Sequence, residues 1–183
     1  MRLFTAIDLS EEARANIESL LLNLKPAAKL QWSPAANLHI TTKFIGDWPE
    51  SRLDELNAAL TALPAVGPIE IAVRQVGWFP NSDSPRSFWV GVQATPALQE
   101  LAMATNAAML GIGVVAETRP YSPHLTLARI RKPEPLEPLR QAIAALPTLE
   151  FGSFTASRYH LYVSELSSGG SVYTKLADYS LLS

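Results

Sequence analysis

Two short phrases of the same pattern lie 85 positions apart in this chain of 183 residues. The first begins at His39 and reads His-Ile-Thr-Thr-Lys-Phe, and the second begins at His124 and reads His-Leu-Thr-Leu-Ala-Arg. The chain holds 11 threonines and three histidines, so two of the histidines opening a His-x-Thr by chance is roughly a 1% event. The duplication therefore predicts a fold made of two related halves.

The segments around the phrases support this division, because in each half a helical pattern precedes the His-x-Thr strand and another follows it. Apolar spacing and turn residues predict strands at 3–7, 38–45, 69–76, 87–92, near 114, 124–130, 151–165 and 171–181. Helices are predicted from the N-cap Ser10 to about 24, from Pro49 to about 63, from Thr95 to about 110, and around 139–146. This mixed order predicts an α+β fold.

We expect residues 1–183 to form a single domain built of two lobes, related by a pseudo-twofold axis. Two mostly antiparallel sheets would line a central cleft, and the helices would lie on the outside. Such halves, facing each other, would place the two His-x-Thr phrases on opposite walls of the cleft.

Composition narrows the functional class. The chain has no cysteine, which excludes disulfides and thiolate chemistry and is compatible with a reducing cytosol. Its net charge of −2 means that any polyanion must be held by a local basic patch. No apolar run approaches a membrane span, and the first residues lack the pattern of a signal peptide. We therefore expect a cytoplasmic protein, and we expect it to be a monomer.

The spacing of the phrases suits work on a phosphate. Residues two apart on a strand share a face, so His39 lies with Thr41, and His124 lies with Thr126. If the two strands meet, two imidazoles and two hydroxyls surround one small anion. One neutral histidine can then take a proton from water while the other, protonated, gives one to the leaving oxygen. A strained five-membered cyclic phosphate suits this machinery best, and it needs neither a metal nor a cofactor.

Other kinds of site fit the sequence less well. A lone histidine in a β protein is most often structural, but two matched phrases argue against that interpretation here. Two histidines seldom hold a metal alone, and no Asp, Glu or Cys stands at ligand spacing nearby. A Ser-His-Asp triad is disfavoured because there is no Gly-x-Ser-x-Gly elbow. His160 has no threonine two places on, so it is interpreted as structural.

Charged and aromatic neighbours are less certain candidates. Lys43 is predicted to share the face of His39 and Thr41, from which it could reach a phosphate or the RNA backbone. Arg129, five places after His124, would point away unless a bulge or a strand end turns it inward. Three further cations flank the second phrase and form either a local basic patch or a solvated surface: Arg119, Arg131 and Lys132. The aromatic residues are mostly core candidates, and one or two of them would stack on a base: Trp32, Trp48, Trp78, Phe79, Trp89 and Tyr121.

The chain resembles a known family over nearly its whole length. The resemblance rests on both phrases, on the opening Phe-Thr-Ala-Ile-Asp-Leu at 4–9, on Gly-Trp-Phe-Pro at 77–80, and on Leu-Tyr-Val-Ser-Glu-Leu at 161–166. These segments are similar to the two-histidine phosphoesterases, in their bacterial RNA 2′,3′-cyclic phosphodiesterase branch, also called LigT-like 2′-5′ RNA ligases. The first phrase departs at Thr42, where the family usually has leucine; by parity this residue faces away from the cleft, so we expect only a change in packing.

The resemblance implies a bilobal α+β fold and an enzyme that opens RNA 2′,3′-cyclic phosphate ends to 2′-phosphates without a metal. Some members also join such an end to a 5′-hydroxyl in the reverse direction. Carried onto this sequence, His39 is the proton donor to the leaving 3′ oxygen and His124 is the acceptor that activates water. Thr41 and Thr126 hold the phosphate, with Arg129 as a further helper.

Two other functions stay open at this point. A module of the same fold would bind phosphate-ended RNA without turning it over. An enzyme of the same chemistry would act on a small cyclic nucleotide or on a cyclised ADP-ribose derivative.

Overall fold

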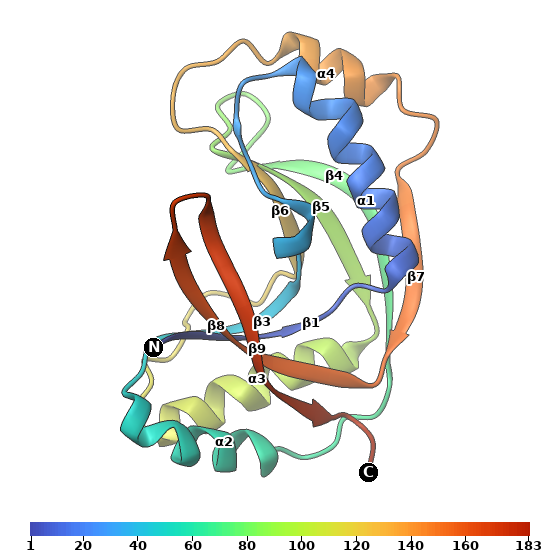
Figure 1. Cartoon of the computed structure of the whole chain (residues 1–183). Coiled ribbons are helices and arrows are strands. Elements are labelled where there is room, and N and C mark those ends of the chain that lie inside the picture. The colour runs from blue at the N-terminus through green and yellow to red at the C-terminus, as the bar shows by residue number, and fades with distance from the viewer.

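Two sheets, each wholly antiparallel, form the framework of the computed structural model, which describes all 183 residues (Figure 1). Sheet A has the order β3 (Ile40–Asp47), β1 (Arg2–Ile7), β8 (Arg158–Ser167) and β9 (Gly170–Ser180). Sheet B has the order β2 (Gln31–Trp32), β6 (His124–Arg129), β5 (Ser87–Ala94), β4 (Ile69–Phe79) and β7 (Glu150–Ala156). The predicted α+β class is thereby confirmed.

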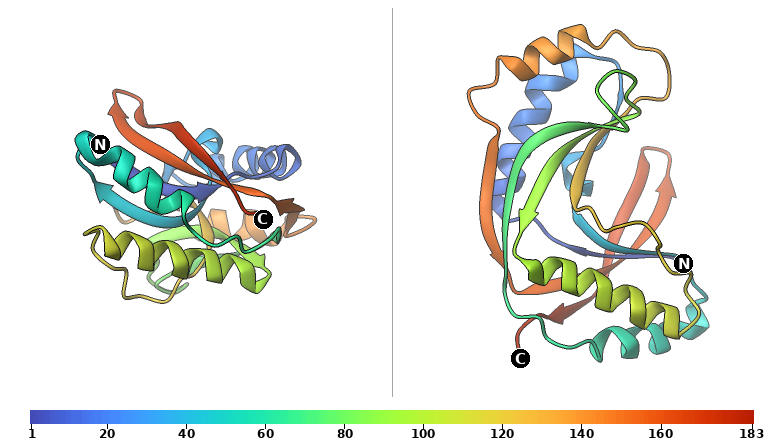
Figure 2. Two further views of the ribbon diagram at one scale, coloured as in Figure 1. Left: turned by 90° about the horizontal axis from the view of Figure 1, so that it is seen from below. Right: turned by 180° about the vertical axis from the view of Figure 1, so that it is seen from behind.

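Four α-helices cover the outer faces of the sheets. Helices α1 (Glu11–Leu24) and α4 (Glu137–Ala144) lie against sheet B, whereas α2 (Leu53–Thr61) and α3 (Pro96–Gly111) lie side by side under sheet A (Figure 2). Three short 3-10 helices complete the chain: η1 (Lys25–Ala27), η2 (Ala35–Asn37) and η3 (Glu50–Arg52). None of the helices is long and apolar enough to cross a membrane.

The two halves exchange their helices. Helix α1 follows a strand of sheet A in the chain but packs on β7 of sheet B, while α3 follows a strand of sheet B but packs on β3 of sheet A. Each His-x-Thr strand is thus preceded by a helix that covers the opposite sheet and followed by one that covers its own. This exchange gives the molecule the predicted pseudo-twofold arrangement.

The first helix illustrates how the sequence specifies its own elements. The Ser10 hydroxyl accepts a hydrogen bond from the Ala13 amide at 3.2 Å, and two glutamates occupy the first turn, where the helix dipole favours negative charge. Its buried residues recur at helical spacing and join a core of 36 buried apolar side chains that runs through both lobes: Ala13, Ile17, Leu20, Leu21 and Leu24.

Some predicted boundaries were wrong. The strand expected near Val114 does not form; residues 112–123 have no helix or strand, and the Val114 side chain is buried as part of the main hydrophobic core. Strand β2 was not predicted, because two residues carry too little pattern to be recognised. His39 lies one residue before β3, whereas His124 is the first residue of β6.

Matching bulges interrupt the two His-x-Thr strands. In β3, Ala6 pairs with Thr41 and Thr5 pairs with Lys43, so Thr42 is an extra residue. In β6, Trp89 pairs with Thr126 and Phe88 pairs with Ala128, so the extra residue there is Leu127, the position equivalent to Thr42. A bulge reverses the parity of every residue that follows it.

The bulge at Thr42 overturns the prediction for Lys43. Its side chain does not share the face of His39; it is buried on the helix side, where Nζ donates to Asn106 Oδ1 at 2.8 Å and to the Val115 carbonyl at 3.2 Å. Thr42 also faces the helix side, as predicted, and its hydroxyl lies 2.7 Å from that of Thr5.

We predict that Lys43→Met lowers the free energy of unfolding by about 1–3 kcal/mol, because it leaves the partners of the ammonium group without a donor. Urea unfolding measures this loss, with the exposed Lys132→Met as the matched control. A weaker affinity for substrate with unchanged stability would instead return Lys43 to the phosphate-binding face.

Candidate active site

His39 lies on the inner face of sheet A, by which we mean the face that carries no helix. Its side chain is only 7% exposed and rests over the ring of Tyr162, with 4.5 Å between the ring centroids. Its Nδ1 atom lies 3.2 Å from the carbonyl oxygen of Asn37, two residues earlier. A carbonyl oxygen only accepts, so Nδ1 carries a hydrogen and Nε2 is the atom free to exchange protons.

His124 repeats this arrangement on the inner face of sheet B. Its Nδ1 atom lies 2.8 Å from the carbonyl oxygen of Ser122, again two residues earlier. In contrast to His39, His124 is exposed. Its ring lies near that of Trp89, with 6.4 Å between the ring centroids. Both imidazoles are therefore held in the same tautomer, with Nε2 available for chemistry.

The two threonines keep their hydroxyls free. Thr41 and Thr126 are half-buried, and neither hydroxyl has a hydrogen-bond partner in the protein, whereas the neighbouring Thr42 is fully engaged with Thr5. Because they precede the bulges, they remain on the inner faces with their histidines. Each inner face thus presents one imidazole and one free hydroxyl, as the sequence predicted.

Hydrogen bonds between the lobes bring the two strands together. Strands β3 and β6 are in contact, and the Tyr121 hydroxyl, three residues before His124, donates to the Thr41 carbonyl at 2.9 Å. In the reciprocal direction, the Ser33 amide, ahead of β3, donates to the Leu127 carbonyl at 2.8 Å. Strand β2 extends this link by pairing Trp32 with Ala128. The histidine-bearing segments are therefore fixed to each other directly.

A tryptophan platform supports the second histidine. The ring of Trp89 lies against Gly77, where an added Cβ would come within 2.1 Å of the indole, and Gly91 pairs with His124. Any side chain at position 77 would push this ring away. The glycine thus allows the flat aromatic surface beside His124 and Thr126.

A group of polar side chains surrounds the first histidine. The Asp8 carboxylate, just after β1, has Oδ1 at 3.6 Å from His39 Nε2. The same carboxylate accepts from Tyr162 Oη and from Lys175 Nζ (2.8 Å), and it lies 3.4 Å from His160 Nε2. His160, interpreted from the sequence as structural, is indeed buried, but it shares Asp8 with His39.

These contacts have opposing effects on ionisation. Burial lowers the pKa of His39, the Asp8 charge raises it, and the Arg14 charge lowers it, so that the pKa ends below its usual value. Burial raises the pKa of Asp8, but the hydrogen bonds from Lys175 and Tyr162 outweigh it and hold the pKa below its usual value. At neutral pH Asp8 is therefore ionised.

The bulge at Leu127 brings Arg129 inward. After the bulge Arg129 pairs with Ser87, which shares the face of Trp89, so the side chain of Arg129 leaves the strand on the inner face of sheet B. Arg129 is exposed and also pairs with Gln31, whose side chain accepts from Arg131 at 2.6 Å. Arg119 instead forms an ion pair with Glu117. Phe44 occupies the position of sheet A that corresponds to Arg129, and it is 73% exposed.

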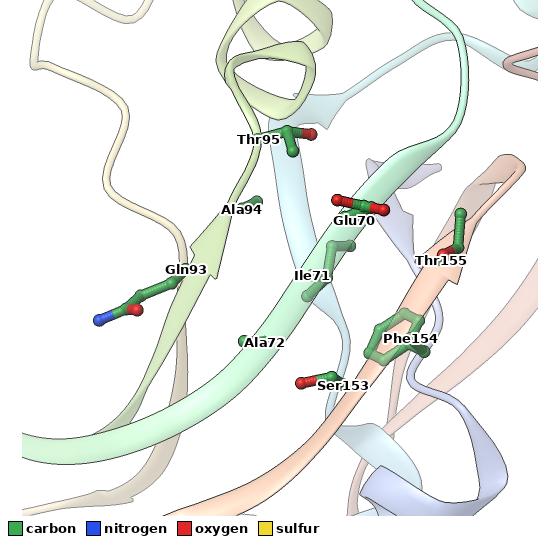
Figure 3. Close-up of a pocket in the computed structure, with 9 residues that line it drawn as sticks. All are labelled: Glu70, Ile71, Ala72, Gln93, Ala94, Thr95, Ser153, Phe154 and Thr155. Atoms are coloured by element: carbon green, nitrogen blue, oxygen red, sulfur yellow. The ribbon is translucent and has the colours of Figure 1, made fainter.

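A shallow, open pocket lies elsewhere on sheet B. It measures about 580 Å³ and spans β4, β5 and β7, with Glu70 as its only charged residue (Figure 3). Without a cation or an imidazole it is poorly suited to a phosphate. Nor does any cluster of three or more His, Asp, Glu or Cys residues provide a set of metal ligands.

Comparisons with known proteins decide the family. Residues 8–167 match the sequence model of the 2′-5′ RNA ligase superfamily. This chain belongs to that superfamily. It is 33% identical to the RNA 2′,3′-cyclic phosphodiesterase of Methanothermobacter thermautotrophicus, with 99% of each chain covered. It is also 33% identical to the enzyme of the same name from Thermus thermophilus, over 99% of this chain and 90% of that protein.

Solved structures of the superfamily share the fold. The protein TT0787 of Thermus thermophilus superposes with a TM-score of 0.81 at 29% identity, covering 99% of this chain and 98% of that one. LigT of E. coli, crystallised with NADP⁺, gives a TM-score of 0.77 at 26% identity, covering 100% and 98%. The resemblance noted from the sequence is thereby confirmed.

Three site residues carry too little signal to be found by sequence reasoning alone. Asp8 ends a buried strand and stood among the opening residues of the resemblance, but no motif connects it to His39. Tyr121 and Trp89 stood among six aromatic residues predicted to lie mostly in the core, with one or two of the six stacking on a base. Their roles follow from contacts between segments 80 and 35 residues apart, which pattern does not reveal.

We predict that Tyr121→Phe lowers kcat roughly 10-fold or more, because the Thr41 carbonyl loses its cross-lobe donor and the strands lose alignment. Tyr159→Phe is the matched control, since Tyr159 also donates to a carbonyl, that of Leu60, at 2.9 Å but on the far side of sheet A. Both variants should lose about 1–3 kcal/mol of stability. Equal activity in the two variants would contradict an aligning role for Tyr121.

Proposed function

We propose that this protein hydrolyses RNA 2′,3′-cyclic phosphate ends to 2′-phosphates by paired-histidine acid–base catalysis. One observation carries the proposal: on adjoining segments of two lobes, each imidazole has Nδ1 directed at a carbonyl oxygen, which leaves Nε2 to exchange protons on the same face as an unbonded threonine hydroxyl. The names of the full-length relatives support the choice of substrate.

In this reaction His124 Nε2 takes a proton from water, and the water oxygen forms a bond to phosphorus. The P–O3′ bond breaks on the opposite side, and His39 Nε2 gives its proton to the leaving 3′ oxygen. The hydroxyls of Thr41 and Thr126 donate to the non-bridging oxygens, where charge develops. The proton balance needs one protonated and one neutral imidazole at the start, which predicts a bell-shaped dependence of rate on pH.

Two further side chains suit the rest of the RNA. Arg129, turned inward by the bulge, is available to a non-bridging oxygen or to the next phosphate. Phe44 and Trp89 present aromatic surfaces on the inner faces of opposite sheets, and either is placed to stack on a terminal base. Ligation of a cyclic end to a 5′-hydroxyl would use the same groups in the same roles, with the 5′-hydroxyl in place of water. The 5′-hydroxyl loses its proton to His124 as its oxygen bonds to phosphorus, and the P–O3′ bond breaks as His39 gives its proton to the 3′ oxygen.

The direct test is incubation of the protein with an oligonucleotide ending in a 2′,3′-cyclic phosphate, in the presence of EDTA. We expect a 2′-phosphate product, identified by mass spectrometry and by its end chemistry, and no loss of rate with chelator. 2′,3′-cyclic AMP assayed in parallel should be a poorer substrate, since it lacks the phosphates that Arg129 would bind. Binding without any product would favour a non-catalytic RNA-end module, and loss of activity in EDTA would contradict the mechanism.

Substitution of either histidine should remove one proton transfer. We predict that His39→Ala and His124→Ala each lower kcat by about 10²–10⁴-fold. Thr41→Val and Thr126→Val should lower it less, with Thr174→Val, an exposed threonine on β9, as the control that keeps full activity. Near-normal turnover in either alanine variant would refute paired catalysis.

A further inference from the structure

The two halves of the site carry the same motif but differ in the surroundings of the histidine Nε2 atoms. Both imidazoles have the same backbone contact at Nδ1, yet their Nε2 atoms meet different surroundings. A carboxylate oxygen lies 3.6 Å from Nε2 of His39. No carboxylate lies within ion-pairing distance of His124, which is exposed. The pseudo-twofold symmetry of the chain is therefore broken at the nitrogen that moves the proton.

Asp8 is well suited to act on its neighbour. It stands where the chain leaves β1 and before the N-cap of α1, and its two oxygens are held by Tyr162 and Lys175. Its carboxyl is ionised at neutral pH for the reasons given above. A negative charge that close to a largely buried imidazole favours the form with hydrogens on both nitrogens.

Charges from each packed element act on His39 together. The Asp8 carboxylate favours the imidazolium, whereas Arg14 on α1 and Lys175 on β9 oppose it. The remaining titratable neighbours are Tyr162 on β8, Tyr173 on β9 and His160, which contacts Asp8 from the other side. Asp8 is the only anion in this set, so His39 depends on it for charge compensation.

We propose that Asp8 is the positioning residue that offsets the effect of burial and of the two cations on His39, so that the imidazole can carry a proton at Nε2 at the start of a turnover, and that it thereby makes His39 the proton donor and His124 the acceptor. The inference rests on the proposed function for its catalytic meaning. Asp8 itself exchanges no proton with substrate. After turnover His39 is neutral and His124 is protonated, and exchange with solvent restores the starting state.

The proposal is tested by two substitutions with opposite expected signs. Asp8→Asn keeps the shape of the side chain and removes its charge, so the pKa of His39 should fall by about one unit. Lys175→Met removes an opposing cation and frees the carboxylate, so the pKa of His39 should rise. Imidazole NMR titration of the folded protein measures both shifts, and His124 serves as the internal control that should not move.

The kinetic consequence follows from the fraction of enzyme that carries a protonated His39. For Asp8→Asn, kcat/KM relative to the unmodified protein should approach 1 at low pH and fall to roughly one-tenth at high pH, with no rise in KM. For Lys175→Met the same ratio should exceed 1 at high pH. Asp8→Glu should restore part of the loss, whereas Asp178→Asn, which removes a carboxylate paired with Arg158 at 2.9 Å, should leave the ratio at 1.

The two hypotheses fail separately. Absence of product from the unmodified protein would sink the proposed function, while the NMR titration would still report on Asp8. A His39 pKa that does not move in Asp8→Asn, or that moves equally with that of His124, overturns the inference even if the enzyme is active. If Asp8→Asn fails to fold, an unchanged His39 pKa in Lys175→Met overturns it alone.

Discussion

The site depends on a reciprocal exchange of hydrogen bonds between the segments that carry the histidines. The chain just ahead of β3 pairs with β6, through Trp32 and Ser33, and the chain just ahead of β6 returns a bond to β3, through Tyr121 and Thr41. Each histidine follows one of these crossing segments. The relative position of the two imidazoles is therefore set by a few hydrogen bonds between the two segments next to them. The sheets and helices serve mainly to hold those segments in place.

Around this junction the molecule is symmetric in backbone and asymmetric in environment. The bulges at Thr42 and Leu127 match, and so do the contacts of both Nδ1 atoms with carbonyl oxygens. The surroundings then diverge, since His39 is buried beside a carboxylate and His124 is exposed beside an indole. This difference in surroundings is the basis of our proposal that one copy of the motif gives a proton and the other takes it.

The alternation of side chains along a strand predicted the correct face for the residues before each bulge, but not for those after it. It placed Thr41 and Thr126 with their histidines because no irregularity intervenes. It assigned Lys43 to the wrong face, and it left Arg129 undecided, because one extra residue reverses the alternation. A bulge depends on how neighbouring strands fit together, and the residues within one strand carry little trace of it. Strand β2 was missed for another reason, since its two residues are too few to show a pattern.

The sequence by itself determined the fold class, the two related halves, and the four His and Thr side chains on which the proposal rests, because periodicity and motif spacing act within single segments. Only the tertiary structure decided which residues surround each histidine, since Asp8, Tyr121, Trp89 and Lys175 reach the site from strands and loops distant in sequence. Contacts of that kind arise from packing between segments, and their energies depend on distances that no local pattern encodes.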